Sequence, residues 1–583
     1  MVRLSRRSLL GTGATIGIVG IGGVSRVESD GDDPFPLERY IEPLPIPEAI
    51  SPSAVQKSTP IYEIDLLEFD HSLHPDLPST TMWGFNAQYP GPTIAVSRDE
   101  SIILRFDNSQ LPDEHLFPVD ERIGGTTPEN HPGDVATVPA VRTSIHPHGL
   151  KVPPESDGQS DMWISPDGNT GPRYDGSAQP ITNRQARMTS MYHDHTAGVT
   201  RLNVYAGLVG LYIIEIELEQ QLALPSGPYD IPVLLQDKRL NEDGSLEYPD
   251  SFVSEFSGDV PVVNGSIWPY LEVEPRRYRF RFLNGANQRT FNLRIETEDG
   301  GRVELHQFAP GHGFLEDVVP LGRSGYPGAL TLAPFERADV IVDFADLAGQ
   351  TLYLMNDAEF PYHGMNAGSD LEEILEVRVT DPSQPPSDSS VDPDELTLPV
   401  ARRFDEEEAH ITRSHTLENH IDPATGMTEH LLNGHGFGDM DAVFEPILDT
   451  IEVWELTNET EHSHPIHLHL VTFRVIGRGD NGTNEPHPSD RGLKDTVRVD
   501  PGETVRIAVK FDGYTGRYPW HCHALEHEDF SMMVPFRVVR EFQTYADSDG
   551  LVDRSGVTKA LADWRRGEIN RSMVETVLDA WVE

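Results

Sequence analysis

Cysteine is almost absent from this chain. Of its 583 residues only Cys522 is a cysteine, so no disulfide can form within the chain. This excludes the small exported proteins whose fold depends on a framework of paired cysteines. A single cysteine is either incidental or a thiolate with a chemical use, and its sequence neighbours decide between the two.

Positive charge is also scarce. The chain has six lysines, and its 45 lysine and arginine residues face 95 aspartate and glutamate residues, for a formal net charge of -50. Such a surface repels nucleic acids and anionic membranes, so we expect neither as a partner. The charge is typical of a halophilic protein, because salt at 1 M screens charges within roughly 3 Å. An acidic secreted protein from a low-salt environment is the alternative.

Long apolar runs are missing, so we expect no membrane span, which needs about 20 apolar residues. Near the start, residues 5–10 read Ser-Arg-Arg-Ser-Leu-Leu and precede a glycine-rich, weakly apolar stretch. This pattern is typical of a twin-arginine export signal, here residues 1–30, a route that carries folded proteins. We therefore expect an extracellular or cell-surface protein, with an ordinary basic N-terminus as the alternative.

The chain does contain many short alternating strands separated by proline and glycine. Examples are the segments 101–106, 210–215, 277–283, 339–344 and 503–509. Such strands with turn signals between them predict an all-β fold built of sandwich domains.

Polar, proline-rich breaks at 224–228 and from 381 onward divide the chain into three domains of ordinary size. The predicted ranges are 45–222, 226–380 and 399–543, with a linker at 381–398. Two short amphipathic patterns then predict a helical tail at 544–583. We expect a monomer.

Histidine gathers in four motifs. In chain order they are His146-Pro147-His148, His193-Asp194-His195, His464-Pro465-Ile466-His467-Leu468-His469, and His521-Cys522-His523 with His527 and Met532 close behind. Side chains two apart on a strand share a face, and adjacent ones point oppositely. Both histidines of each His-x-His pair can therefore reach one cluster. In the last motif Cys522 faces away from His521 and His523, so one strand can supply ligands to two metal sites.

Copper is the metal that suits these ligands. Two imidazoles, one thiolate and a weak axial thioether describe a blue-copper electron-transfer site. The chain supplies that set as Cys522, His464, His527 and Met532. His462 competes with His464, and the spacing favours His464. The other eight histidines suit three further coppers, with two imidazoles on one copper and three on each of the others.

The four motifs in this order resemble those of the multicopper oxidase family, in the branch of bacterial spore-coat laccases and bilirubin oxidases. The likeness covers about residues 40–542 and includes the segments 306–316, 464–473 and 521–533. It implies three cupredoxin-like Greek-key β-sandwich domains. It also implies an enzyme that takes single electrons from phenolic or related organic reductants at a type 1 copper and reduces dioxygen to water at a three-copper cluster.

The resemblance further implies a role for each ligand. The type 1 copper has the four ligands named above. The type 2 copper is held by His146 and His467, and the type 3 pair by His148, His193, His195, His469, His521 and His523. One departure is Pro147, where the family often has an aromatic or aliphatic residue; its fixed φ and missing N–H constrain that strand.

Two carboxylates, Asp157 and Glu528, match positions where relatives place acids near the cluster. Because reduction of dioxygen to water consumes protons, both are candidate proton carriers and join Cys522 as predicted catalytic residues. The alternative for both is hydrogen bonding that orients the ligand imidazoles.

Two other functions stay open. A metal-ion oxidase of the same family, acting on Cu(I), Fe(II) or Mn(II), would need acidic or methionine residues beside the type 1 site. The 12 methionines form no run, which disfavours a dedicated Cu(I) oxidase. A non-catalytic copper-binding cupredoxin protein is the second alternative, and the complete ligand set argues against it.

Overall fold

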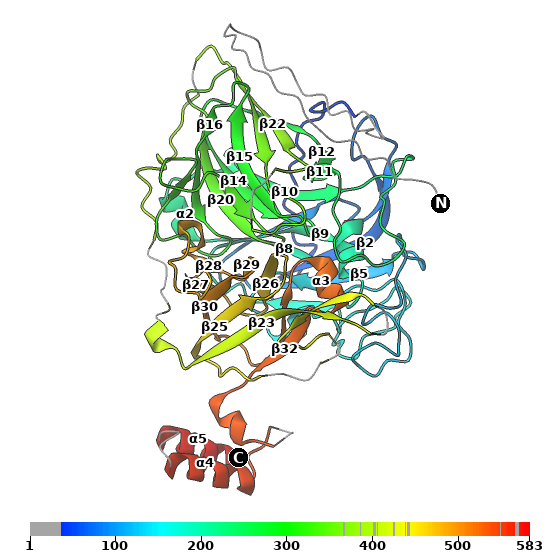
Figure 1. The fold of residues 1–583 in the computed structure, drawn as a ribbon, viewed down its shortest axis with the longest axis vertical. Helices are drawn as coiled ribbons and strands as arrows, with labels where there is room; N and C mark the ends of the chain where they lie inside the picture. Colours follow the sequence, from blue (N-terminus) through cyan, green and yellow to red (C-terminus); the bar gives the residue numbers. More distant parts are fainter. Residues whose placement is uncertain are drawn as a thin grey trace, which may run out of the picture. The chain divides into compact units, whose positions relative to one another are not determined.

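The described residues form six β-sheets arranged as three pairs (Figure 1). The structure is a computed structural model and describes residues 37–364, 368–384, 386–399, 404, 406–423, 426–437, 439, 444–547, 550–565 and 571–582. The predicted export signal, residues 1–30, lies outside the described residues. Within the described residues, no helix is both long enough and apolar enough to cross a membrane.

The first pair of sheets comes from the N-terminal part of the described chain. One sheet contains β1 (Ala54–Gln56), β2 (Thr59–His71), β3 (Thr80–Phe85), β5 (Ile102–Gln110) and β7 (Ala178–Ile181). The other contains β4 (Gly91–Ser97), β6 (Ile145–Pro147), β8 (Met188–Asp194) and β9 (Val209–Glu215). Strand β2 shows why these segments are strands: Ile64 and Leu66 are buried, whereas Glu63 between Tyr62 and Ile64 is exposed.

The second pair of sheets follows, drawn in green in Figure 1. Its larger sheet contains β10 (Asp230–Lys238), β11 (Val260–Val263), β12 (Ser266–Ile267), β14 (Arg277–Asn284), β17 (Leu305–Ala309), β18 (Val319–Leu321) and β20 (Arg337–Asp343). Its smaller sheet contains β13 (Tyr270–Val273), β15 (Phe291–Thr297), β16 (Arg302–Val303), β19 (Leu330–Leu332), β21 (Thr351–Asn356) and β22 (Glu373–Val379). Phe280 of the larger sheet and Leu293 of the smaller one belong to one buried cluster, so the two sheets form a sandwich.

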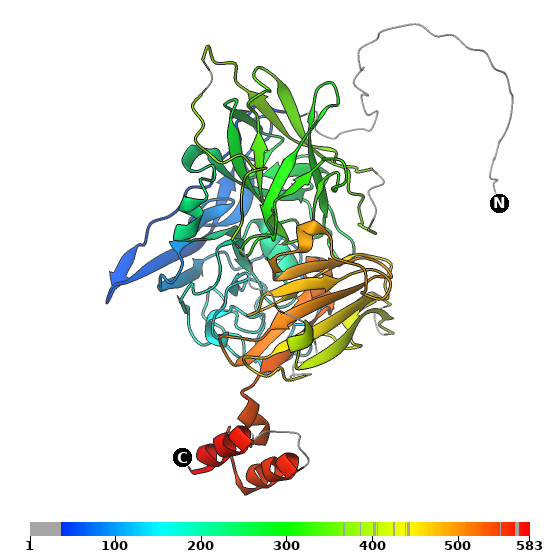
Figure 2. The same ribbon diagram turned by 90° about the vertical axis from the view of Figure 1, so that its left-hand side faces the viewer.

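The third pair of sheets carries the cysteine and is drawn in yellow and orange (Figure 2). One sheet contains β23 (Ile411–Ile421), β24 (Thr428–Leu432), β25 (Ile451–Asn458), β27 (Phe473–Gly477), β28 (Leu493–Lys494) and β30 (Thr504–Lys510). The other contains β26 (His464–Leu468), β29 (Thr496–Val499), β31 (Gly516–Cys522) and β32 (Met533–Val538). Trp454 and Ile507 of the first sheet share a buried cluster with Ile466 and Trp520 of the second.

Helices are few and short. The α-helices are α1 (Thr200–Ala206), α2 (Glu217–Gln221), α3 (Leu525–Phe530), α4 (Arg554–Arg565) and α5 (Arg571–Val582). The 3-10 turns are η1 (Pro154–Ser156), η2 (Gly227–Tyr229), η3 (Glu406–Glu408), η4 (Pro488–Asp490) and η5 (Glu541–Tyr545). Helices α4 and α5 form the predicted tail and bury their own small apolar cluster, which includes Val557 and Val577.

The sequence-predicted strands are confirmed. The five example segments overlap β5, β9, β14, β20 and β30; their ends agree within two residues except at β5, which continues four residues further, to Gln110. The predicted all-β class is therefore correct. The domain boundaries stay a prediction.

A buried charge network joins the first and second pairs of sheets. Oδ2 of Asp339 on β20, which is fully buried, accepts hydrogen bonds from Nη2 of Arg187 at 2.6 Å and Nη2 of Arg279 at 2.5 Å. Three arginines and three carboxylates make up the network: Arg187, Arg279, Arg281, Glu219, Asp230 and Asp339. Burial alone would raise the pKa of Asp339, but the three guanidinium groups outweigh it and hold that pKa well below its usual range.

Candidate metal centre

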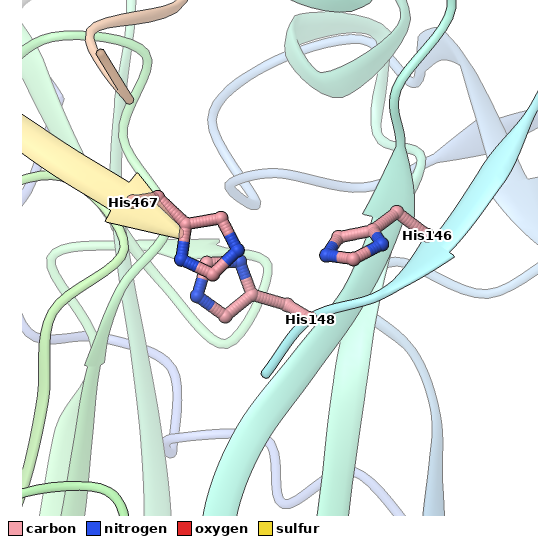
Figure 3. A group of neighbouring side chains, drawn as sticks. All are labelled: His146, His148 and His467. Carbon is pink, nitrogen blue, oxygen red and sulfur yellow. The ribbon is translucent and has the colours of Figure 1, made fainter. Parts of the chain in front are cut away.

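The eight histidines of the four His-x-His pairs come together between the first and third pairs of sheets. Three groups of buried imidazoles each have ligand nitrogens within 4.8 Å of one another: His146, His148 and His467; His148, His193 and His523; and His195, His469 and His521. Figure 3 shows the first group, with His146 and His148 from the end of β6 facing His467 from β26. The clusters therefore need residues from both ends of the described chain.

Strand pairing brings these residues side by side. His146 on β6 lies opposite His193 on β8, and His467 on β26 lies opposite His521 on β31. The second histidine of each pair, such as His148 or His523, lies just past the end of its strand. The two imidazoles of each of the other three pairs enter different groups, one from the strand and one from beyond its end, whereas His146 and His148 share the first group.

The ring nitrogens that face one another are close enough to be ligands of a shared metal. The Nε2 atoms of His195, His469 and His521 lie 3.2–3.3 Å apart. Nε2 of His146 and Nε2 of His467 are buried and have no hydrogen-bond partner within the described residues. Burial lowers the pKa of all these histidines, so they are neutral and offer lone pairs. Imidazole lone pairs converging on one space fit copper.

The opposite ring nitrogen of most of these histidines donates to an oxygen, which fixes the tautomer. Nδ1 of His146 donates to the carbonyl of Asp157 at 2.6 Å, and Nδ1 of His467 to the carbonyl of Asp495 at 2.9 Å. Nδ1 of His193 donates to the carbonyl of Asp194 at 2.8 Å. The ring of His148 has the opposite orientation, because its Nδ1, not its Nε2, faces another ligand histidine: it lies 3.4 Å from Nε2 of His193.

Asp157 and Glu528, the two predicted acids, both contact ligand imidazoles. Oδ2 of Asp157 accepts from Nδ1 of His469 at 2.9 Å. The carboxylate of Glu528 lies 3.5 Å from Nδ1 of His195 and 3.1 Å from Nδ1 of His521. Both acids are fully buried; burial raises the pKa of Asp157 well above its usual range and that of Glu528 to about 8. This geometry supports the orienting role and places both acids where a proton carrier would stand.

A second site surrounds the cysteine. Sγ of Cys522 lies 3.5 Å from Nδ1 of His464 and 3.8 Å from Nδ1 of His527, and these two nitrogens are 3.2 Å apart. The amide of Met532, whose side chain is buried, donates to the carbonyl of His527. His462 instead lies beside Glu255 and is one-quarter exposed. One soft sulfur with two imidazole nitrogens is a donor set that suits copper.

The outer edge of His527 faces a small pocket. Its Nε2 lies 3.2 Å from Oε1 of Glu255 and 3.1 Å from Nε2 of Gln288, and the ring is only 1% exposed. Tyr362, His462 and Arg498 also line this pocket. Glu255 and His462 are about one-quarter exposed and are therefore more accessible to solvent than His527.

Sequence reasoning missed three contacts of these sites. His430 on β24 is a third imidazole at the cysteine site, grouped with His464 and His527. Asp495 accepts hydrogen bonds from Arg337 and from His312 at 2.7 Å, and its Oδ1 lies 3.3 Å from Nε2 of His148. Glu255 is the third. All three come from segments distant from the motifs, and no local pattern marks them.

Known proteins resemble this chain over most of its length. A sequence profile described as "Multicopper oxidase" matches residues 407–541. A laccase from Haloferax volcanii is 54% identical over 582 residues, which cover 100% of this chain and 99% of that protein. A laccase from Bacillus subtilis is 38% identical, covering 86% of this chain and 99% of its own length. The crystal structure of the multicopper oxidase McoA from Aquifex aeolicus has a TM-score of 0.68 at 28% identity, covering 85% of this chain and 99% of that one.

Proposed function

Since this chain belongs to the multicopper oxidase family, as its two laccase relatives show, we propose a role for each residue of its two sites. The protein is a copper enzyme of cupredoxin-like β-fold and an oxidase of the laccase type. It oxidises small organic reductants, phenols among them, and dioxygen is the electron acceptor.

We assign four coppers to the described histidines and Cys522. Cys522, His464, His527 and Met532 hold the type 1 copper. His146 and His467 hold the type 2 copper; His148, His193 and His523 hold one type 3 copper, and His195, His469 and His521 the other. The nitrogen groups above support this division, because the two type 3 triads are two of those groups, and His146 and His467 belong to the third, which also includes His148. Copper in these sites supplies one-electron redox chemistry and the binding of dioxygen.

Reductants dock in the pocket over His527. Glu255 and His462 are partly exposed at its rim and offer an acceptor and a second polar group to a phenolic O–H. Because Glu255 accepts from Nε2 of His527, the docked molecule is one hydrogen-bonded residue away from a type 1 ligand. Cys522 is joined through the backbone to His521 and His523, so a few covalent bonds connect the two sites.

Protons reach the cluster through buried carboxyl groups. Glu528 contacts Nδ1 of both His195 and His521, and Asp157 contacts Nδ1 of His469. Each acid lies behind the ligand imidazoles and can hold a proton when protonated. The hydrogen bond from His469 to Asp157 also orients that ring, so Asp157 combines both roles.

The observation that carries the proposal is the position of Cys522 at the end of β31. Its sulfur faces His464 and His527, while the histidines on either side of it enter the imidazole groups. We expect copper-loaded protein in high salt to be blue and to consume oxygen with syringaldazine. Cys522→Ser is expected to lose both the blue colour and at least 1000-fold of the activity, on the order of 4 kcal/mol. A Cys522→Ser protein that keeps full oxygen uptake would refute the assignment.

A metal-ion oxidase is the second candidate, and Glu255 is the observation that favours it. Its carboxylate lies beside His527, where a cation such as Cu(I), Fe(II) or Mn(II) would be attracted. Oxygen uptake with these ions but not with phenols would select this candidate. A blue protein without turnover on either class would instead be the non-catalytic cupredoxin alternative.

We also propose that the enzyme is exported by the twin-arginine route to the outside of the cell, works in salt and is a monomer. The arginine pair at residues 6–7 and the net charge of -50 support the first two points. Replacing both arginines with lysine should keep the enzyme inside the cell, as fractionation would measure. Sedimentation in high salt measures the oligomeric state.

A further inference from the structure

His430 is a buried histidine that the ligand assignment leaves without a task. It lies on β24, in the sheet opposite β26 and β31, and is 2% exposed. Neither Nδ1 nor Nε2 of its ring has a hydrogen-bond partner within the described residues. Burying two unpaired polar atoms is unfavourable, and a leucine or phenylalanine would fill the same space without that cost.

The ring of His430 is packed directly on the proposed type 1 site. Its centroid lies 3.9 Å from that of His527, with the planes inclined by 35°, and 5.3 Å from that of His464. One of its nitrogens lies within 4.8 Å of ligand nitrogens of both histidines. The Nδ1 atoms of His464 and His527 face Sγ of Cys522, and His430 packs beside both of these rings.

We propose that His430 is a third imidazole of the type 1 site and offers its nitrogen to the copper as a weak donor, besides Met532. This inference rests on the proposed function, since it requires copper beside Cys522. Weak additional donors tune the reduction potential of such sites. A nitrogen lone pair stabilises the more highly charged, oxidised ion more than the reduced one. His430 therefore lowers the potential of the type 1 site.

Three substitutions separate a donor from a packing residue. His430→Phe keeps a flat ring against His527 but has no lone pair, and His430→Leu has neither. His430→Gln restores a donor atom on a flexible side chain. His415→Phe is the matched control, because His415 is equally buried in the adjacent strand β23 and already bonds Asn433 at 2.9 Å.

The measurement is a redox titration of copper-loaded protein, followed by the thiolate-to-copper absorption band and by electron paramagnetic resonance. We expect both His430→Phe and His430→Leu to shift the reduction equilibrium at least tenfold toward the reduced state, about 59 mV for one electron. His430→Gln should lie between them and the wild type, and His415→Phe should match the wild type.

The other outcomes also decide for or against the inference. An unshifted potential in both Phe and Leu variants, or a shift in Leu alone, would mean that the ring only packs. If Phe and Leu lose the type 1 copper, a Gln variant that keeps it supports the donor role, and a Gln variant that loses it overturns that role. A wild-type protein without the absorption band would overturn the type 1 assignment itself, and the inference with it.

Discussion

Replacing Asp339 with asparagine is the sharpest test of how the first two pairs of sheets are held together. The buried network balances three arginines with three carboxylates. Asp339→Asn removes the fully buried negative charge of the network and leaves a net charge of about +1 there. Breaking a buried ion pair in this way costs about 3–5 kcal/mol.

The assay is urea unfolding in concentrated salt, with fluorescence and circular dichroism compared because a multidomain protein need not unfold in one step. With a slope of about 3 kcal/mol/M, the affected transition should shift by about 1–1.7 M urea. Glu63→Gln is the control, since it breaks the exposed Arg105–Glu63 pair, which contributes at most about 1 kcal/mol. The double variant Arg187→Met with Asp339→Leu rebalances the charges and should recover much of the loss. Equal urea midpoints of the unfolding transition for wild type and Asp339→Asn would refute the reasoning.

The pKa of Asp339 also predicts how the stability of the fold depends on pH. The pKa of Asp339 is lowered in the folded protein, where the guanidinium groups of Arg187, Arg279 and Arg281 outweigh its burial. A carboxyl group of this kind stabilises the fold above its unfolded pKa of about 3.9, and this stability is lost as the pH falls toward the folded pKa. The difference in the free energy of unfolding between wild type and Asp339→Asn should therefore have its full size above about pH 5 and shrink below about pH 4.

Two further predictions concern the sites. Asp495→Asn weakens the bonds from Arg337 and His312 and the contact with His148, so the cluster should bind copper about 10–100-fold less tightly. The copper content after dialysis against a chelator measures this affinity, and an Asp495→Asn protein that keeps all of its copper would contradict the prediction. Glu255→Gln should raise KM for phenols about 10–150-fold, because a charge-assisted hydrogen bond contributes about 1.5–3 kcal/mol, and should leave KM unchanged for a reductant without an O–H group. An equal effect on both reductants would show that Glu255 acts only through His527.

The fold class and the clustered ligands could be predicted because their signals are local. Alternation of apolar and polar residues marked strands such as β14 and β30, and a two-residue spacing put pairs such as His521 and His523 near one centre. The pattern did not show that His148 and His523 lie beyond their strand ends. Pairing of β6 with β8 and of β26 with β31 determines which imidazoles meet, and that register is a property of the folded chain.

The remaining site residues could not be found from sequence because their partners are far away along the chain. Glu255 meets His527 across 272 positions, and Asp495 meets His148 across 347. His430 has no second histidine at strand spacing, so nothing local separates it from an ordinary core residue. Asp157 and Glu528 were found only because their positions match those of acids in relatives.

The division of the imidazole groups between the two ends of the chain sets the order of maturation. His146, His148, His193 and His195 leave the ribosome long before His521 and His523 are synthesised. Until the third pair of sheets has folded against the first, each group lacks at least one imidazole, so none can hold its metal tightly. Copper therefore binds late in folding, because only a chain whose last sheet has packed against its first has complete copper sites. Once bound, the metal closes a loop of more than three hundred residues and resists the separation of those ends.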